Sequence, residues 1–195
     1  MIESKLISKA LFTDKSFNNL EALLVQIGVK SYASMEQTHS NMIAHANKLG
    51  IYKSDGIYTS SKNLGLVVKT ADCMPIFLKD KISIGAVHVG WRGVKNKIIN
   101  NALKNFNLNE LLMSVGPHAQ SCCYEVKEDV SKYLYKYIDK RGGKEYLNMS
   151  QSLIDLSYKI GFKIEVSSIC TICSSSYNSY RENKTSKRQY GFIWQ

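Results

Sequence analysis

The sequence predicts a mixed-sheet domain of the α+β or α/β class, on the basis of three observations. Apolar runs of strand length and amphipathic helical segments interleave irregularly along the 195 residues. The apolar runs 74–78 and 82–89 are separated only by the polar residues 79–81, which is typical of a β-hairpin. We find no internal repeat, low-complexity tract or Pro/Gly-rich linker, so we expect residues 1–195 to form a single domain.

The first part of the chain is expected to hold one helix among short strands. Asn18 or Asn19 can cap a helix that runs to Ile27, and Gly28 ends it, because asparagine is favoured at helix starts and glycine just past helix ends. Strands are expected over residues 6–12, 30–37, 56–59 and 64–69.

After the hairpin the hydrophobic period changes. Val94, Ile98, Ala102 and Phe106 fall four residues apart, which predicts an amphipathic helix. The remaining expected elements are a strand over residues 111–115, helices over 126–138 and 153–160, and a strand over 162–169.

Composition limits the classes of partner. The apolar fraction of 44% and the charged fraction of 22% are typical of a globular protein. The net charge of +10 comes from single lysines spread along the chain, without a basic block. A generally lysine-rich composition explains this charge best and an anionic small substrate comes next, whereas nucleic acid is not expected as a partner. The sequence indicates no oligomeric state.

The expected location is the cytoplasm. No apolar run is long enough to span a bilayer, so no membrane partner is expected. The first residues lack the basic head and apolar run of a secretion signal. Five cysteines, an odd number, argue against a disulfide framework and fit a reducing compartment.

Two histidines and one cysteine suggest a metal centre. His39 follows an expected strand, and Cys73 and His88 lie at neighbouring ends of the two hairpin runs. Such a set of three ligands leaves one coordination position open, which is the arrangement of catalytic zinc. Taken singly, Cys73 is more often buried packing and His88 a hydrogen-bonded core residue.

The turn after His88 strengthens the metal interpretation. Residues 90–93 join His88 directly to a helix start, so free backbone N–H groups and the Arg92 guanidinium lie beside the imidazole. Residues that only pack in a core rarely bring a cation, an anion-binding site and a thiol together.

Two further cysteine pairs leave several interpretations open. Cys122 and Cys123, near His118, can support the metal centre, form a second soft-metal site, or be structural packing. Cys170 and Cys173 have the spacing of half a zinc site or of a redox pair, and we expect a mainly structural role. His45 is expected at the surface.

The tail mixes aromatic and basic residues over 177–181 and 187–193. Such a segment can form the wall of a nucleoside pocket, although an aromatic-rich terminal strand in the core is the plainer explanation.

Together these motifs resemble the YfiH-like family, also called laccase-domain or multicopper polyphenol oxidase proteins. The order of Asp-Cys-x-Pro and His-x-Gly-Trp-Arg-Gly is highly specific. The segments that carry the resemblance are Gln-Thr-His (37–39), Asp-Gly-Ile-Tyr-Thr (55–59), Thr-Ala-Asp-Cys-Met-Pro (70–75), His-Val-Gly-Trp-Arg-Gly (88–93), Gly-Pro (116–117), Cys-Tyr-Glu-Val (123–126), Cys-Thr (170–171) and Ser-Tyr-Arg (179–181).

The chain departs from the family pattern in two places. Thr38 and Ser40 flank His39 where the family has Val and Gly, which is expected to loosen the turn after the first ligand. Residues 186–189 replace the family's Thr-Gly-Arg, so the role of that segment in substrate binding is open.

The resemblance implies a layered α+β fold with mixed sheets flanked by helices, and zinc held by His39, Cys73 and His88. It also implies phosphorolysis of adenosine, inosine, guanosine and methylthioadenosine, and deamination of adenosine. Copper-dependent phenol oxidation is an older assignment for the family, so copper is the alternative metal.

We expect the following roles at such a site. In deamination, a water on the open metal position attacks C6 of adenine. In phosphorolysis, Arg92 and the N–H groups around Gly93 hold the phosphate, which makes them the substrate-binding residues. Asp72 is a candidate for orienting a ligand or accepting a proton, and His118 for acid–base catalysis alongside Arg92.

Three rivals remain. A metal-free hydrolase would use Cys73 as nucleophile and His88 as base, and a converging His39 discriminates against it. Multicopper oxidation needs several copper ions and many histidines, and four histidines cannot build that site. The third rival is a zinc-stabilised binding protein without activity.

Overall fold

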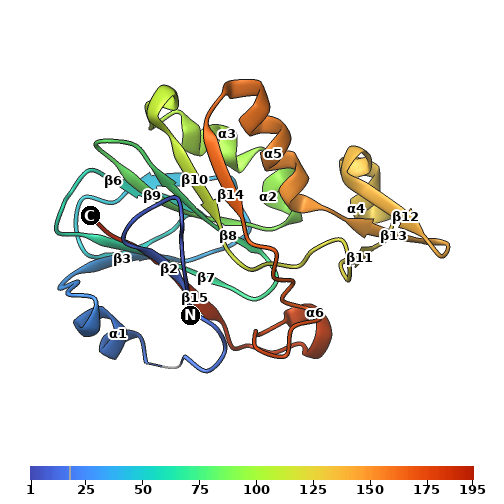
Figure 1. Ribbon diagram of the computed structural model, residues 1–195, viewed down its shortest axis with the longest axis horizontal. Helices are drawn as coiled ribbons and strands as arrows, with labels where there is room; N and C mark the ends of the chain where they lie inside the picture. The colour runs from blue at the N-terminus through green and yellow to red at the C-terminus, as the bar shows by residue number, and fades with distance from the viewer. Residues whose placement is uncertain (18) are drawn as a thin grey trace.

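The computed structural model describes residues 1–17 and 19–195 and shows a layered α+β fold (Figure 1). Across these ranges the strands form two six-stranded sheets and one three-stranded sheet. Both larger sheets are mixed, with parallel pairs such as β3–β7 and β10–β14 beside antiparallel ones. The α+β class expected from the sequence is therefore confirmed, and a single domain over residues 1–195 stays a prediction.

The first sheet has the order β1 (Ile2–Glu3), β2 (Ala10–Phe12), β15 (Gln189–Ile193), β7 (Gly65–Thr70), β3 (Tyr32–Met35) and β5 (Gly50–Tyr52). The second has the order β14 (Lys163–Val166), β10 (Leu112–Val115), β8 (Met74–Lys79), β9 (Ile84–Val89), β6 (Gly56–Thr59) and β4 (Ile43–His45). The small antiparallel sheet has the order β11 (Glu125–Val126), β13 (Lys144–Leu147) and β12 (Ile138–Arg141).

The helices are short, apart from one. They are α1 (Leu20–Gln26), α2 (Trp91–Lys95), α3 (Ile98–Leu103), α4 (Glu128–Leu134), α5 (Met149–Ile160) and α6 (Tyr180–Asn183), with single 3-10 turns η1 (Leu108–Glu110) and η2 (Tyr135–Tyr137). Among the described residues, none of these helices has both the length and the apolar character needed to cross a bilayer.

The two large sheets pack face to face, with α1 outside the first sheet and α2, α3 and α5 outside the second (Figure 1). Phe12 of the first sheet stacks on Phe77 of the second, with ring centroids 4.6 Å apart. On β8 the neighbours Ile76 and Leu78 point instead to the helical layer. Because side chains alternate along a strand, a strand buried on both faces is apolar throughout.

The expected hairpin is confirmed by the pairing of β8 with β9. The expected helix cap is also confirmed, since the Asn19 side chain accepts a hydrogen bond from the backbone N–H of Ala22, 2.9 Å away. Asn18, the other candidate, lies outside the described residues. Gly161 ends α5 with a φ of 96°, a left-handed conformation that favours glycine.

One predicted helix is divided into two in the structure. The apolar spacing predicts a single helix from Val94 to Phe106, but the chain forms α2 and α3. The break lies at Lys97, whose φ of 55° interrupts the helical hydrogen bonds. Ile98 and Ala102 are nevertheless buried against β9 and its neighbours, so the regularly spaced apolar residues still face the core after the break.

Candidate functional site

The structure brings the three expected metal ligands together. His39 follows β3, Cys73 directly precedes β8, and His88 lies in β9. One potential ligand atom from each lies within 4.8 Å of the others, and the Cys73 Sγ is 3.7 Å from the Nε2 of His39. The hairpin register explains part of this, because Pro75 pairs with His88 and so places Cys73 beside the imidazole.

The turn that presents His39 is wrapped around the carboxylate of Asp55. The backbone N–H groups of Thr38, His39 and Ser40 donate to its two oxygens over 2.7–3.1 Å. The Ser40 hydroxyl donates as well, over 2.7 Å. These bonds hold His39 at a φ of 61°, a strained conformation for a residue with a side chain. Ser40 therefore contributes two hydrogen bonds to the turn, and the loosening expected there stays a prediction.

Asp55 also orients the second imidazole. Its Oδ1 lies 2.8 Å from the Nδ1 of His88, and both side chains are buried. Burial alone raises the pKa of Asp55, but hydrogen bonds from His88 and Ser40 outweigh burial and keep that pKa well below its usual range. The ionised carboxylate therefore accepts the Nδ1 proton of His88, so Nε2 is the atom that can bind a metal once it gives up its own proton.

The charge on Cys73 depends on the same cluster. Burial raises the pKa of Cys73, but the positive charge of His88 and the hydrogen bond from His39 lower it to about 6. Burial likewise lowers the pKa of His88, but the Cys73 thiolate and the bond to Asp55 raise it to about 9. At neutral pH the sulfur is a thiolate, the form that binds metals and acts as a nucleophile.

Gly90 keeps open the space between the ligands. A Cβ at this position would lie 2.9 Å from the Cys73 Sγ and 3.2 Å from the Cδ2 of His39. Both distances are shorter than ordinary contacts, so only glycine leaves room for the two side chains and an ion. Two imidazoles and one thiolate are a donor set that fits a transition metal.

The ligands open into a cavity of about 650 Å³. Its wall carries five cations and three aromatic rings beside the ligands. The cations are Lys69, Arg92, Arg181, Lys184 and Arg188, and the rings belong to Trp91, Tyr124 and Tyr180. The cavity therefore suits a small anion joined to a flat ring system.

The two residues expected to bind substrate separate in the structure. Arg92 lines the cavity, where its guanidinium lies 4.4 Å from the Trp91 ring centroid. Gly93 is not among the residues that line the cavity. A Cβ on Gly93 would meet Ile98 and Val89 at 3.2 and 3.3 Å, so this glycine allows α2 to pack closely on the core.

Asp72 lines the cavity, but hydrogen bonds occupy its carboxylate. Its Oδ1 accepts from the Thr171 hydroxyl over 2.8 Å, and its Oδ2 from the backbone N–H of Arg181 over 2.6 Å. Its carbonyl oxygen accepts from the N–H of Ala119. Asp72 therefore ties three loops together next to Cys73.

His118 is fully buried and does not line the cavity. Its Nδ1–H donates to the carbonyl oxygen of Gly116 over 2.9 Å, and its Nε2 has no hydrogen-bond partner among the described residues. Burial lowers its pKa to about 4. His118 is thus neutral at pH 7 and forms no part of the cavity wall, and its acid–base role stays a prediction.

Asp55, Tyr124 and Lys184 belong to the site although no role for them was expected from the sequence. Asp55 and Tyr124 lie in motifs that carry the family resemblance, so the sequence did contain an indication that they belong to the site. The C-terminal tail forms both part of the pocket wall and part of the core, the two roles that its sequence allowed. Tyr180, Arg181 and Arg188 line the cavity, whereas Phe192 and Ile193 lie in the core.

Comparison with known families gives a match over most of the chain. A family described as "Multi-copper polyphenol oxidoreductase laccase" matches residues 14–195. A purine nucleoside phosphorylase of Aquifex aeolicus is 38% identical over 140 residues, covering 70% of this chain and 68% of the relative. A purine nucleoside phosphorylase of Borreliella burgdorferi is 31% identical over 183 residues, covering 85% and 80%.

Solved structures share the fold. YlmD from Geobacillus stearothermophilus superposes with a TM-score of 0.87 at 20% identity, covering 98% of this chain and 94% of that one. The hypothetical protein YfiH of Bacillus licheniformis superposes with a TM-score of 0.77 at 24% identity, covering 88% and 78%.

Proposed function

The chain belongs to the multi-copper polyphenol oxidoreductase laccase family, and on that premise we propose that it is a zinc-dependent purine nucleoside phosphorylase. The observation that carries the proposal is the cluster of His39, Cys73 and His88 at a cavity lined by cations and aromatic rings. The relatives from Aquifex aeolicus and Borreliella burgdorferi, both named purine nucleoside phosphorylase, support the substrate class.

In the proposed reaction a phosphate oxygen forms a bond to C1′ of the ribose while the bond from C1′ to N9 of the purine breaks. The base leaves with the electron pair of that bond and takes up a proton. Arg92, Arg181 and Arg188 bind the phosphate and hold it beside C1′, because guanidinium groups form paired hydrogen bonds with phosphate oxygens. Tyr124 and Tyr180 provide flat surfaces for the base.

The metal we propose is zinc, bound by His39, Cys73 and His88. With one thiolate and two neutral imidazoles as ligands, a bound zinc ion would carry a formal charge of +1 and would supply positive charge beside the cavity. The same donors also bind copper, which is therefore the alternative in any metal analysis.

Deamination of adenosine has less support. Zinc deaminases use a carboxylate that is not a metal ligand as the proton carrier. Among the described residues that line the cavity, Asp72 is the one carboxylate, and both of its oxygens already accept hydrogen bonds. We therefore rank phosphorolysis first.

Copper-based phenol oxidation is not proposed, despite the family description. Of the four histidines of the chain, two belong to the cluster. His45 is exposed on β4 and stacks on Tyr58, and His118 is buried away from the cavity. A site with several copper ions needs more imidazoles than these.

The metal-free hydrolase is the closest rival, because Asp55, His88 and Cys73 also form a chain that resembles a catalytic triad. The convergence of His39 and the space kept by Gly90 favour a bound ion, since a Cys–His pair needs neither.

The test is an assay of purified protein, with its metal content measured, on adenosine, inosine, guanosine and methylthioadenosine, each with and without phosphate. Mass spectrometry identifies the products. We expect phosphate-dependent release of free base and ribose 1-phosphate, lost in His39→Ala and retained in the matched control His45→Ala.

Each rival predicts a different result. Full activity after complete metal removal, or in His39→Ala, supports the Cys–His hydrolase. Conversion of adenosine to inosine without phosphate supports deamination. If neither the metal-loaded wild type nor His88→Ala turns over any nucleoside, while His88→Ala melts at a lower temperature, the protein is a zinc-stabilised binding protein.

A further inference from the structure

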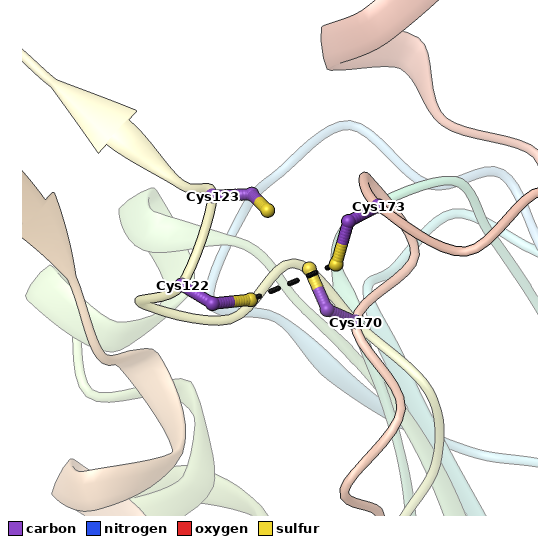
Figure 2. A group of neighbouring side chains, drawn as sticks. All are labelled: Cys122, Cys123, Cys170 and Cys173. Carbon is purple, nitrogen blue, oxygen red and sulfur yellow. Dashed lines mark hydrogen bonds between the residues drawn. The ribbon is translucent and has the colours of Figure 1, made fainter.

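Four of the five cysteines of the chain form a second cluster, separate from the three ligands at the cavity (Figure 2). Cys122 and Cys123 lie in the turn between β10 and β11, and Cys170 and Cys173 lie in the turn between β14 and α6. Figure 2 shows the four side chains directed into the space between the two turns. All four sulfur atoms lie within 4.8 Å of one another.

The spacing of the sulfur atoms fits a tetrahedral ion better than a disulfide. Cys122 Sγ and Cys173 Sγ are 3.8 Å apart, and all four thiols are free. A disulfide needs about 2.0 Å between its sulfur atoms. Four sulfurs around a zinc ion, each about 2.3 Å from the metal, lie about 3.8 Å from one another in a regular tetrahedron.

A backbone hydrogen-bond donor lies beside Cys170, the buried member of the cluster. The Gln120 N–H lies 3.4 Å from the Cys170 Sγ. Backbone donors around a sulfur stabilise its negative charge, which metal binding also requires. Four sulfurs so close together cannot all be thiolates unless a cation lies among them.

We propose that Cys122, Cys123, Cys170 and Cys173 bind a zinc ion as a closed structural site. Four thiolates fill the coordination sphere, so this site has no open position for a substrate. Binding releases the four thiol protons and leaves the unit with a formal charge of −2, from a +2 ion and four −1 ligands. The Arg141 guanidinium, which donates to the carbonyl oxygen of Ser121, places a compensating cation beside the first turn.

The four-cysteine site lies next to residues that line the cavity or border its ligands. Thr171, between the two cysteines of the second turn, donates to the Asp72 carboxylate, and Asp72 precedes Cys73. Tyr124 follows Cys123 and lines the cavity. An ion that joins the two turns therefore fixes one wall of the cavity through Tyr124 and Asp72.

The test separates this site from the one at the cavity by removing the latter. In the double variant His39→Ala/His88→Ala, elemental analysis is expected to find about one zinc ion per chain, and X-ray absorption is expected to find sulfur neighbours at about 2.3 Å from the zinc. Adding Cys122→Ser/Cys173→Ser should remove that ion. The matched control is Ser175→Ala, an exposed residue near the second turn, which should retain it.

Cobalt gives a second measurement on the folded His39→Ala/His88→Ala variant, in which the cavity site no longer contributes a sulfur ligand. Cobalt in a four-thiolate site produces strong sulfur-to-metal absorption and the visible bands of a tetrahedral ion, and these should vanish with Cys122→Ser/Cys173→Ser. A folded His39→Ala/His88→Ala protein that binds no zinc overturns the proposal, as does zinc with mainly nitrogen or oxygen neighbours. A Cys122–Cys173 disulfide in protein prepared with zinc and reductant overturns it too. All of these results are independent of nucleoside turnover.

Discussion

Asp55 Oδ1 lies 2.8 Å from His88 Nδ1, and the same carboxylate accepts the backbone N–H groups of the turn that carries His39. One buried side chain therefore positions two of the three expected ligands. The third, Cys73, is placed by the β8–β9 hairpin beside His88. The geometry of the cluster thus depends on a residue that is not itself a ligand.

Replacing this carboxylate, Asp55→Asn, is expected to weaken metal affinity by about 10- to 100-fold, the usual effect of losing such a partner. The amide that replaces one carboxylate oxygen can donate to Nδ1, which moves the imidazole proton to Nε2, the atom needed for the metal. Competition with a chromophoric chelator measures the affinity.

Asp80→Asn is the matched control for Asp55→Asn. Asp80 is also buried and accepts three backbone N–H groups, from Ile82, Ser83 and Asn107, but it lies away from the cavity. Its replacement should lower the free energy of unfolding and leave metal affinity unchanged. Equal metal affinities in Asp55→Asn and the wild type would contradict the orienting role.

Much of this site was predictable from sequence, because its chemistry is concentrated in short motifs. A hairpin between two apolar runs brings the residues at their neighbouring ends close together. Cys73 and His88 occupy such ends, and they are adjacent in the structure. The hairpin itself follows from local pattern. The position of His39 depends on contact with Asp55 across sheets, which no local spacing reveals.

Other features depend on long-range packing and could not be predicted. The break at Lys97 leaves the apolar period intact, so the spacing gives no sign of it. His118 looks like an acid–base candidate in sequence, since it follows Gly-Pro at a strand end. Only the fold shows that it points to the Gly116 carbonyl rather than into the cavity.

Gly90→Ala is expected to abolish metal binding while leaving the fold in place. The added methyl group would stand 2.9 Å from the Cys73 Sγ, so the sulfur or His39 must move out of the ligand position. Elemental analysis of the purified variant measures the loss.

Gly93→Ala provides the comparison, because a methyl group there meets Val89 and Ile98 in the core instead. We expect it to cost about 1–3 kcal/mol of stability through overpacking and to keep its metal. If Gly93→Ala lowers the affinity for phosphate at unchanged metal content, the substrate-binding role expected for Gly93 from the sequence is correct.

Arg92→Gln is expected to raise the KM for phosphate by about 10- to 100-fold, which corresponds to the loss of a charged hydrogen bond of about 1.5–3 kcal/mol. The KM for the nucleoside should change less, because Arg92 is proposed to contact the anion. Steady-state kinetics with each substrate varied in turn separates the two effects.

The matched control for Arg92→Gln is Lys62→Gln, an exposed cation that does not line the cavity at the metal ligands. It removes the same charge from a chain of net charge +10. A comparable rise in the KM for phosphate in Lys62→Gln would mean that overall charge, not contact, attracts the anion.

The acid side of the stability profile is expected to depend on His118. Burial lowers its pKa to about 4 in the folded protein, while the unfolded chain has the ordinary value near 6.5. Between these values the unfolded state binds more protons, so the free energy of unfolding falls as pH falls from about 6.5 to 4. A shift of this size corresponds to about 3 kcal/mol, and protonation would also bury an N–H at Nε2, an atom with no acceptor among the described residues.

His118→Asn is expected to remove this pH dependence, because its amide can still donate to the Gly116 carbonyl oxygen and does not titrate. Urea unfolding at a series of pH values from 4 to 7 measures the slope, and the exposed His45→Asn should leave it unchanged. The same variant tests the acid–base role expected from the sequence. If His118 only packs, kcat stays close to the wild-type value at pH 7, whereas a large loss of kcat with an unaltered stability profile would identify it as a catalytic residue.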